Sequence, residues 1–341
     1  MILKTTRYRL TDIAEVERAK KDTIYPAGTV FIQVSATNGQ VKMLTEPGTI
    51  ETKYATIIPW GYIDPFYFCE AVKRAVPEFT KKYQSTLNIQ MGDFKFFQID
   101  IHDDPATQIE INFLFRLCDH IVTTEQELHN YLKRLKKAML QKLFNQEVRF
   151  KKDDGTDYAD WEEKSISTLV VPANKDKVDT SKYKKITIGL HKKGISYSTV
   201  HENMVDTRPF YRRYKGELII GKQNYFNGSI AIIPDEFDGC ICSNAIMSFI
   251  FNDCVNGRFL YEAISRDIYL AYHSHLAEGG GQKELSEKKF LQMTVAIPSD
   301  IEEQTKIANC LAEFDNLIDA SERRLEAYKL LKKSMMQKMF V

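Results

Sequence analysis

The chain has 341 residues, 43% of them hydrophobic, and its 47 Lys and Arg nearly balance its 46 Asp and Glu. This length and composition favour two packed domains and exclude a low-complexity chain. The formal net charge of +1 does not indicate a nucleic-acid-binding protein, unless the positive charge is local. No apolar run has the roughly 20 residues of a membrane span or the pattern of a signal peptide. Six cysteines without a CxxC pair are typical of reduced thiols in a cytoplasmic protein.

The first globular segment is expected to span residues 1–104 and to combine strands with a helix. Runs rich in β-branched and aromatic residues predict strands at 29–34, 54–58 and 94–101. Residues 68–75 favour a helix, and a first long helix is predicted at 105–145.

The second half of the chain follows the same order. The polar residues 146–160, which contain a glycine, are interpreted as a linker, and residues 161–300 as the second globular segment. In that segment, strands are expected at 186–190, 217–220, 229–233 and 245–251, and a short helix at 255–265. A second long helix is predicted at 301–341. This mixture predicts the α+β class with irregular sheets, because the alternation of a doubly wound fold is missing.

The last helix carries a single apolar stripe. No Gly or Pro interrupts residues 302–340. Its apolar residues recur at steps of three, four or seven: Ile307, Leu311, Phe314, Ile318, Leu325, Tyr328, Leu331, Met335 and Met339. This spacing is close to that of a coiled-coil seam. At about 1.5 Å per residue the helix would be roughly 58 Å long, which is more than a core needs, so we interpret it as a spacer.

The chain contains an internal repeat with an offset of 196 residues. Asp315–Phe340 aligns with Asp119–Phe144, and the endings LKKSMMQKMF and LKKAMLQKLF agree at most positions. In the same register, residues 290–297 fall on 94–101. Chance convergence of two amphipathic helices is the alternative, but the shared register upstream argues against it. The repeated unit is therefore a globular domain followed by a long helix, and two such helices would bury their stripes against each other.

Motifs at both ends of the last helix carry a family resemblance. Ile297–Pro298 precedes the helix, Glu303–Gln304 and Ile307 lie in its first turns, and LKKSMMQKMF ends it. These motifs resemble the C-terminal conserved region of type I restriction–modification specificity subunits. Members of that family have two target-recognition domains separated by two long antiparallel helices, so the resemblance covers nearly the whole chain. It implies that the two long helices pair as an antiparallel coiled coil.

The two globular segments can be aligned with each other, and the first is shorter. Residues 25–32 resemble 214–220, residues 38–41 resemble 227–230, and residues 12–14 match 165–167. The 12 positions from residue 13 to residue 25 correspond to 48 positions from residue 166 to residue 214, so the first copy lacks about 36 residues. We therefore expect a shortened first target-recognition domain, and whether this domain reads bases stays open.

The segment that the first copy lacks is the basic one. Residues 182–222 contain ten Lys or Arg against three Asp or Glu, interleaved with aromatic and amide side chains. Arg and Lys suit phosphates and guanine edges, and Asn and Gln suit adenine edges. A solvated basic face is the alternative, but the resemblance favours contact with the major groove of DNA. The candidate DNA-binding residues are Arg208, Arg212, Arg213, Lys215, Lys222, Gln223, Asn224 and Tyr225.

A glycine-rich stretch supplies one more candidate. Gly279–Lys283 reads GGGQK, and the backbone N–H groups of such a turn can lie against a phosphate. Lys283 therefore joins the candidates, with a flexible loop tip as the alternative. The chain lacks the GxxxxGK[ST], GxGxxG, HExxH and GxSxG motifs. A loose nuclease-like pattern of Pro234–Asp235 with Glu287–Lys289 could bind Mg²⁺, but it is common by chance in a highly charged chain.

The resemblance implies a non-catalytic specificity subunit that binds double-stranded DNA in the cytoplasm. Its implied partners are methyltransferase subunits, two of them, and restriction motor–nuclease subunits. Together they would methylate adenine, and restrict DNA, at a two-part target. S-adenosylmethionine, ATP and Mg²⁺ would be used by the partners, and we expect no cofactor, metal site or catalytic residue in this chain. The alternatives are a scaffold protein that does not read DNA and a stand-alone Mg²⁺-dependent nuclease.

Overall fold

The structure is a computed structural model that describes residues 4–35, 39–61, 63–84, 87–198, 208–278 and 284–340. The chain forms two compact units. Unit 1 consists of residues 1–132 and 318–341, and unit 2 consists of residues 133–317. In the described part of the chain, no helix is both long enough and apolar enough to cross a membrane.

Unit 1 is built around a four-stranded antiparallel sheet of order β2-β7-β4-β5. Its elements are β1 (Thr5–Arg9), α1 (Leu10–Ile13), β2 (Ala14–Arg18), β3 (Ile24–Tyr25), β4 (Val30–Gln33), β5 (Val41–Met43), β6 (Gly48–Thr49), β7 (Tyr54–Pro59), α2 (Pro65–Tyr83), the 3₁₀ helix η1 (Met91–Phe96) and β8 (Gln98–His102). Helix α2 begins at Pro65, where the Asp64 side chain accepts hydrogen bonds from two backbone N–H groups. Its apolar face joins the sheet residues in one core.

Unit 2 has a sheet of the same design, of order β10-β17-β14-β15. Its strands are β9 (Glu162–Ser165), β10 (Val170–Pro172), β11 (Ile186–Ile188), β12 (Ile195–Tyr197), β13 (Phe210–Arg212), β14 (Leu218–Gly221), β15 (Ile230–Ile232), β16 (Ile241–Ser243), β17 (Ile246–Phe251) and β18 (Thr294–Ile297). Its helices are η2 (Ile166–Thr168), η3 (Thr180–Lys182), η4 (Tyr225–Asn227), η5 (Asp235–Phe237), α4 (Gly257–Ile264), α5 (Asp267–His273), η6 (Ser274–Leu276) and α6 (Glu287–Gln292). The mixture is α+β, in agreement with the sequence.

The two units share their strand pairing, so the repeat extends into the globular parts. Each has a two-stranded ladder that leads into a long helix, β1–β8 in unit 1 and β9–β18 in unit 2. Each also has a short ladder beside its sheet, β3–β6 in unit 1 and β13–β16 in unit 2. The hairpin β11–β12 of unit 2 has no counterpart among the strands described in unit 1. It lies within the stretch that the first copy lacks.

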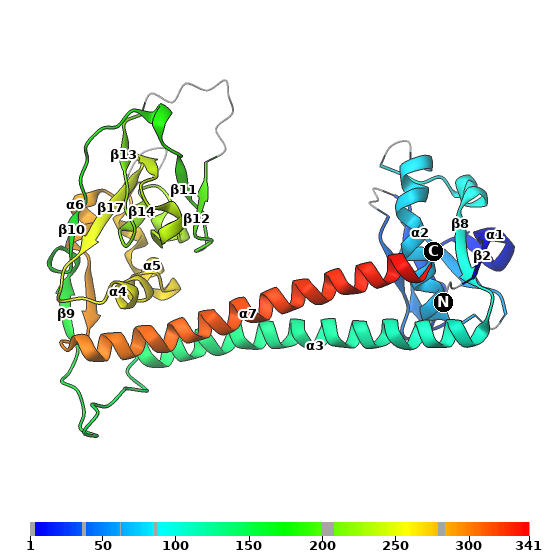
Figure 1. Cartoon of the computed structure of the whole chain (residues 1–341), viewed down its shortest axis with the longest axis horizontal. Helices are drawn as coiled ribbons and strands as arrows, with labels where there is room; N and C mark the ends of the chain where they lie inside the picture. The colour runs from blue at the N-terminus through cyan, green and yellow to red at the C-terminus, as the bar shows by residue number, and fades with distance from the viewer. Residues whose placement is uncertain are drawn as a thin grey trace. The chain divides into compact units, whose positions relative to one another are not determined.

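Two long helices, α3 (Pro105–Phe144) and α7 (Ile301–Met339), contribute to both units (Figure 1). In unit 1 they run antiparallel, because Asp119 pairs with Lys332 and Glu125 pairs with Arg324. In unit 2 Lys136 pairs with Asp315 in the same sense. The apolar stripe is buried at Ile307, Leu311, Ile318 and Leu325. The expectation for Leu331 was wrong, since this side chain is 52% exposed and the neighbouring Lys332 faces the partner helix instead.

The strand expected at 94–101 is only half strand. Residues Met91–Phe96 form a 3₁₀ helix, and β8 begins at Gln98. Phe94 and Phe97 both pack on Phe79, with ring centroids 5.6 and 4.3 Å away. Two side chains three residues apart point the same way in a helical turn and opposite ways in a strand. The core therefore selects the helical turn.

The last residue of each repeated motif enters a core. Phe340 is 1% exposed and packs on Tyr67, His102 and Phe115 of unit 1. Phe144 is buried in unit 2, where its ring lies 5.4 Å from that of Phe259. Each long helix therefore begins beside the domain of its own repeat and ends in the core of the domain that belongs to the other repeat.

Candidate nucleic-acid interface

Three short segments of unit 2 that carry basic and aromatic residues are joined through one strand, β16. Strand β13 pairs with β16, so that Arg212 lies opposite Ile241. On the other side of β16, Lys185 forms a parallel bridge to Ile241, and the N–H of Ile241 donates to the carbonyl of Lys184. The residues just before β11 therefore come next to β13 through β16, although about 25 residues separate them in the sequence.

Arg212 is the centre of this face. Its guanidinium carbon lies 5.0 Å from the ring centroid of Tyr183 and 5.3 Å from that of Tyr214. Lys184 lies over Tyr197, 5.0 Å from its centroid. We call Tyr183, Lys184, Tyr197, Arg212 and Tyr214 the Arg212 face. Both cations are exposed, so they can reach an anion without a change in the core, and a guanidinium held between rings is orientated for bidentate contact with phosphate or guanine.

The other candidate arginine, Arg213, is buried, which corrects the expectation that it contacts DNA. Its side chain is 1% exposed, donates to the carbonyl of Asn174 at 2.7 Å and lies 4.0 Å from the carboxylate of Glu217. Burial raises the pKa of Glu217, and the hydrogen bond from Ser248 and the charge of Arg213 oppose that rise. Arg213 therefore stabilises a buried carboxylate beneath the surface.

Tyr225 is also interior, which corrects a second expectation. It is fully buried, and its hydroxyl donates to the carbonyl of Ile264 at 2.9 Å. Asn224 is half-buried beside it, where its carbonyl accepts from the N–H groups of Asn227 and Ser229. These two residues shape the turn between β14 and β15, and the turn chemistry of the Asn-Tyr-Phe-Asn-Gly stretch explains why they stand there.

The remaining candidates lie at or near the surface of unit 2. Lys215 is exposed and 3.6 Å from the carboxylate of Asp235. Gln223 is exposed and donates to Glu284 at 2.9 Å, whereas Lys222 is half-buried and Arg208 is exposed. Lys283 and the rest of the glycine-rich stretch lie outside the described residues.

The positive charge of residues 182–222 is partly neutralised in the fold. Carboxylates pair with at least four of the ten cations: Lys182 with Asp179, Lys192 with Asp267, Arg213 with Glu217 and Lys215 with Asp235. The local excess of positive charge is therefore smaller than the sequence indicates.

The loose nuclease-like pattern does not form a recognisable metal site. Asp235 pairs with Lys215, and Glu287 pairs with Lys175 at 2.7 Å. Across the described residues, no three His, Cys, Asp or Glu side chains come together in a way that could hold a metal ion. The carboxylates of Asp235 and Glu287 each form an ion pair with a lysine instead.

Four members of the Arg212 face were not among the candidate residues from the sequence: Tyr183, Lys184, Tyr197 and Tyr214. The expected cluster was placed around the turn after β14, whereas the structure brings β11 to β13 through the short strand β16. The signal present in the sequence was the alternation of Lys and Tyr at residues 182–185. The sequence alone does not show that one strand, β16, brings two distant basic stretches together.

Residues 158–329 match the family described as type I restriction modification DNA specificity domain. A stretch of 85 residues is 35% identical to the type I restriction enzyme MjaVIII specificity subunit of Methanocaldococcus jannaschii, which covers 23% of this chain and 20% of the relative. The match therefore spans about a fifth of that curated relative's length.

Solved structures resemble the chain over nearly its full length. The type I restriction–modification S subunit from M. genitalium has a TM-score of 0.65 at 14% identity, with 99% of this chain and 96% of that chain covered. A chain from a study of complex assembly and conformational transition of the type I system has a TM-score of 0.55 at 13% identity, over 99% and 95%. At these identities the likeness concerns the fold.

Proposed function

Because the chain belongs to the type I restriction–modification specificity family, we propose that it is the DNA-recognition subunit of such a complex. In this role it binds double-stranded DNA at a two-part target and carries no catalytic site of its own. It directs the adenine methylation and restriction that partner subunits perform. This function explains why a chain without a metal-binding cluster in its described part carries an exposed basic face.

The Arg212 face is the observation that carries the proposal. Arg212 lies over the rings of Tyr183 and Tyr214, and Lys184 lies over the ring of Tyr197. Charge-assisted contacts from Arg and Lys position a protein on phosphates, and Arg can also bind guanine in the major groove. Arg208, Lys215, Lys222, Gln223, Asn224 and Lys283 remain candidates for neighbouring contacts.

The proposed partners are two methyltransferase subunits and restriction motor–nuclease subunits, in the cytoplasm. S-adenosylmethionine, ATP and Mg²⁺ would be bound by those partners. This chain contributes recognition and geometry, because its repeats provide two domains of one design on a common pair of helices.

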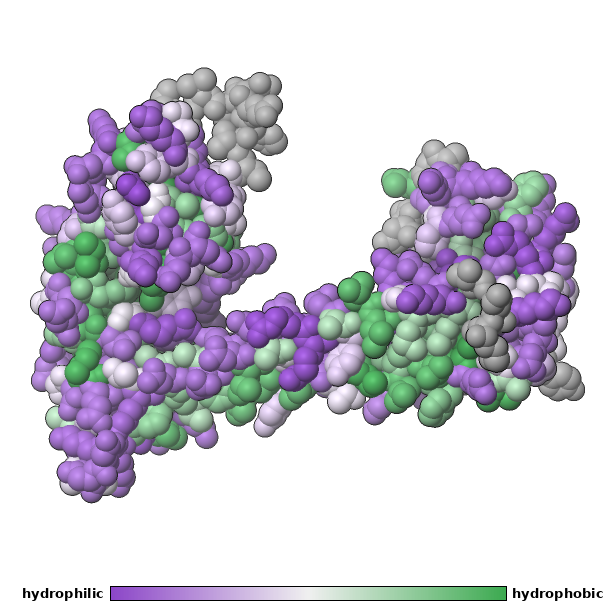
Figure 2. Space-filling model, in the orientation of Figure 1, coloured by the Kyte–Doolittle hydropathy of each residue, from purple (hydrophilic) through white to green (hydrophobic). Residues whose placement is uncertain are grey.

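An exposed apolar stripe on α3 supports assembly with other proteins. Ile109, Phe113 and Leu117 stand one turn apart on the part of α3 in unit 1, and they are 69%, 67% and 44% exposed. Figure 2 shows apolar side chains gathered on this side of unit 1. Large exposed apolar side chains grouped in this way mark interaction surfaces. At the repeat-equivalent positions α7 has Thr305, Asn309 and Glu313, so the two helices would offer different surfaces to partners.

The test is DNA binding by the full chain assembled with its methyltransferase subunits. We expect the double variant Lys184→Ala/Arg212→Ala to bind target DNA about tenfold or more weakly than the wild type. The slope of log affinity against log salt should fall by about 0.9 for each phosphate that the variant no longer neutralises. Fluorescence anisotropy at several salt concentrations measures both quantities, and a genome-wide map of methylated adenines shows whether the two-part target is kept.

The matched control is Lys151→Ala/Lys152→Ala, which removes two exposed cations of unit 2 outside the Arg212 face. This variant should bind as the wild type does. Equal binding by both double variants would contradict the role of the Arg212 face. A wild-type complex that neither binds DNA nor methylates a defined motif would contradict the proposed function itself.

A further inference from the structure

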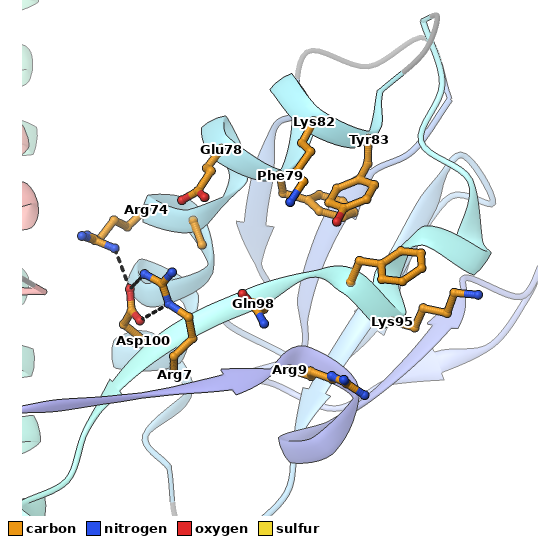
Figure 3. A pocket seen from close by; sticks show the side chains of 12 residues that line it. Arg7, Arg9, Arg74, Glu78, Phe79, Lys82, Tyr83, Lys95, Gln98 and Asp100 are labelled. Atoms are coloured by element: carbon orange, nitrogen blue, oxygen red, sulfur yellow. Dashed lines mark hydrogen bonds and ion pairs between the residues drawn. The ribbon is translucent and has the colours of Figure 1, made fainter.

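Unit 1 has a basic pocket of about 200 Å³ between β1, α2, η1 and β8 (Figure 3). One wall is a pair of stacked rings, Tyr83 and Phe96, with centroids 5.3 Å apart and planes inclined by 7°. Lys82 lies 5.4 Å from the centroid of Tyr83, and Lys95 lies 4.8 Å from that of Phe96. Arg9 at the end of β1 completes the lining at this end of the pocket.

The cations of the pocket divide into two groups. At one end, Asp100 accepts from Arg7 at 2.8 and 3.1 Å and from Arg74 at 3.1 Å. Burial raises the pKa of Asp100, but the hydrogen bonds and charges of the two arginines outweigh this and hold its pKa below the usual value. Asp100 is therefore a carboxylate that already has its counter-ions.

At the other end the cations have no such partner. Within the described residues, Arg9, Lys82 and Lys95 form no ion pair with a carboxylate, and all three are exposed. All three line the same pocket, so each adds positive potential to it. The lining also includes the exposed carboxylate of Glu78, so five cations stand against two carboxylates, and this net positive charge suits an anion from outside the chain.

The positive charge is not a requirement of the repeated fold. The strand pairing corrects the expected match of residues 12–14 with 165–167 by three positions. Opposite the matched strands β8 and β18, Arg9 corresponds to Ser165 and Arg7 corresponds to Glu163. Likewise, Gln98 corresponds to Thr294 and Asp100 corresponds to Ala296. Unit 2 builds the same ladder with one negative and three neutral side chains on this face, so folding does not need the arginines.

We propose that this pocket binds a backbone phosphate of double-stranded DNA through Arg9, Lys82 and Lys95. The inference rests on the proposed function and adds a contact to it. Long cationic side chains around an open pocket suit a phosphodiester, and the exposed Phe96 ring can pack against the adjoining sugar. Such a contact holds the DNA in position without reading its sequence. Unit 1 has no described counterpart of β11–β12. In unit 1 the pocket on the β1–β8 ladder would therefore supply a basic contact from a different part of the domain.

The test compares two triple variants of the full chain in complex with its methyltransferase subunits. For Arg9→Ala/Lys82→Ala/Lys95→Ala we expect about tenfold weaker DNA binding, with the salt slope reduced by about one to two. Phosphate-ethylation interference should disappear at one or two positions on one side of the target. The methylated motif should not change, because the contact carries no sequence information.

The control, Lys20→Ala/Lys21→Ala/Lys42→Ala, removes the same charge from exposed sites of unit 1 outside the pocket. Its salt slope and interference pattern should equal those of the wild type. Equal slopes for the two triple variants overturn the proposal, and this is also the result for a pocket that takes only small free anions. If the wild-type complex binds its target while the pocket variant keeps every interference position, only this inference fails and the proposed function stands.

Discussion

In both units a lysine on one long helix pairs with an aspartate on the other and lies near a buried glutamate, and the lysines and aspartates occupy corresponding positions of the repeat. In unit 1, Lys332 pairs with Asp119 at 2.5 Å and lies 3.6 Å from the buried Glu70 of α2. In unit 2, Lys136 pairs with Asp315 at 2.7 Å and lies 3.4 Å from the buried Glu262 of α4. Both lysines and both aspartates are related by the 196-residue offset. The first lysine of each LKK motif therefore connects one long helix to the other and to a helix of the globular domain.

The units differ on their surfaces rather than in this framework. The β11–β12 hairpin and the Arg212 face belong to unit 2, and the pocket with Arg9, Lys82 and Lys95 belongs to unit 1. The ladder face that is basic in unit 1 carries Glu163 and Ser165 in unit 2. The comparison teaches that the repeat preserves how the domains are held, whereas each domain presents its own charged surface for recognition.

The largest expected loss of stability comes from truncating the phenylalanine that ends each repeated helix motif. Phe340→Ala should reduce the free energy of unfolding of unit 1 by about 3–5 kcal/mol, because a ring that packs on Tyr67, His102 and Phe115 is removed from a core. Phe144→Ala should act on unit 2 instead. Hydrogen exchange followed by mass spectrometry measures the two units separately, at β7 in unit 1 and at β17 in unit 2.

The conservative variants Phe340→Leu and Phe144→Leu are the controls, and they should cost clearly less than the alanine variants, because most of the apolar volume stays. If Phe340→Ala increased exchange at β17 but not at β7, the assignment of each motif end to the domain of the other repeat would be wrong.

A smaller effect distinguishes the two ion clusters. Lys332→Ala should destabilise the protein by about 1–3 kcal/mol, because Asp119 loses its ion pair and the fully buried Glu70 keeps only Lys73. Lys136→Ala should cost less, since Arg258 pairs with both Glu262 and Asp315 and remains in place. Urea denaturation of the two variants measures the difference.

Each motif offers its own control in the exposed lysine that follows, Lys333 or Lys137. Their alanine variants should stay within about 0.5 kcal/mol of the wild type. Equal losses of stability for Lys332→Ala and Lys136→Ala would show that Arg258 does not compensate, and the two clusters would then be equivalent in energy as well as in position.

The sequence predicted the framework better than the surface, for a physical reason. Apolar spacing and a matched motif predicted both long helices, because helical contacts are local and periodic. The burial of Arg213 could not be predicted, since the carbonyl that accepts its hydrogen bond belongs to Asn174, 39 residues away in the sequence. The same holds for Tyr183 and Lys184, because their segment comes beside the strand of Arg212 only through the pairing of both with β16. Recognition surfaces form from segments that are distant in the sequence, and charge counts along the chain do not show which cations are paired.

The smallest predicted effect concerns a difference at the start of the long helices. Unit 1 has His102 where the repeat register places Pro298 in unit 2. The imidazole Nε2 lies 2.6 Å from the carbonyl of Met339, to which it donates, and Nδ1 accepts from the hydroxyl of Tyr67 at 2.7 Å. Burial lowers the pKa of His102, although the Met339 hydrogen bond and Asp103 oppose this. The neutral imidazole is therefore the form that links the end of α7 to unit 1.

Acidification should weaken that link. Because the pKa of His102 is lower in the folded chain, the unfolded chain binds more protons, and stability is lost as the pH falls through about 6.5. We expect the Tm of the wild type to drop by a few degrees more than that of His102→Gln between pH 7.5 and pH 5.5. His120→Gln, at an exposed position of α3, should behave as the wild type does. A His102→Gln variant with the full wild-type pH dependence would show that this buried histidine is not the group that titrates, and the two repeats would then respond to pH alike.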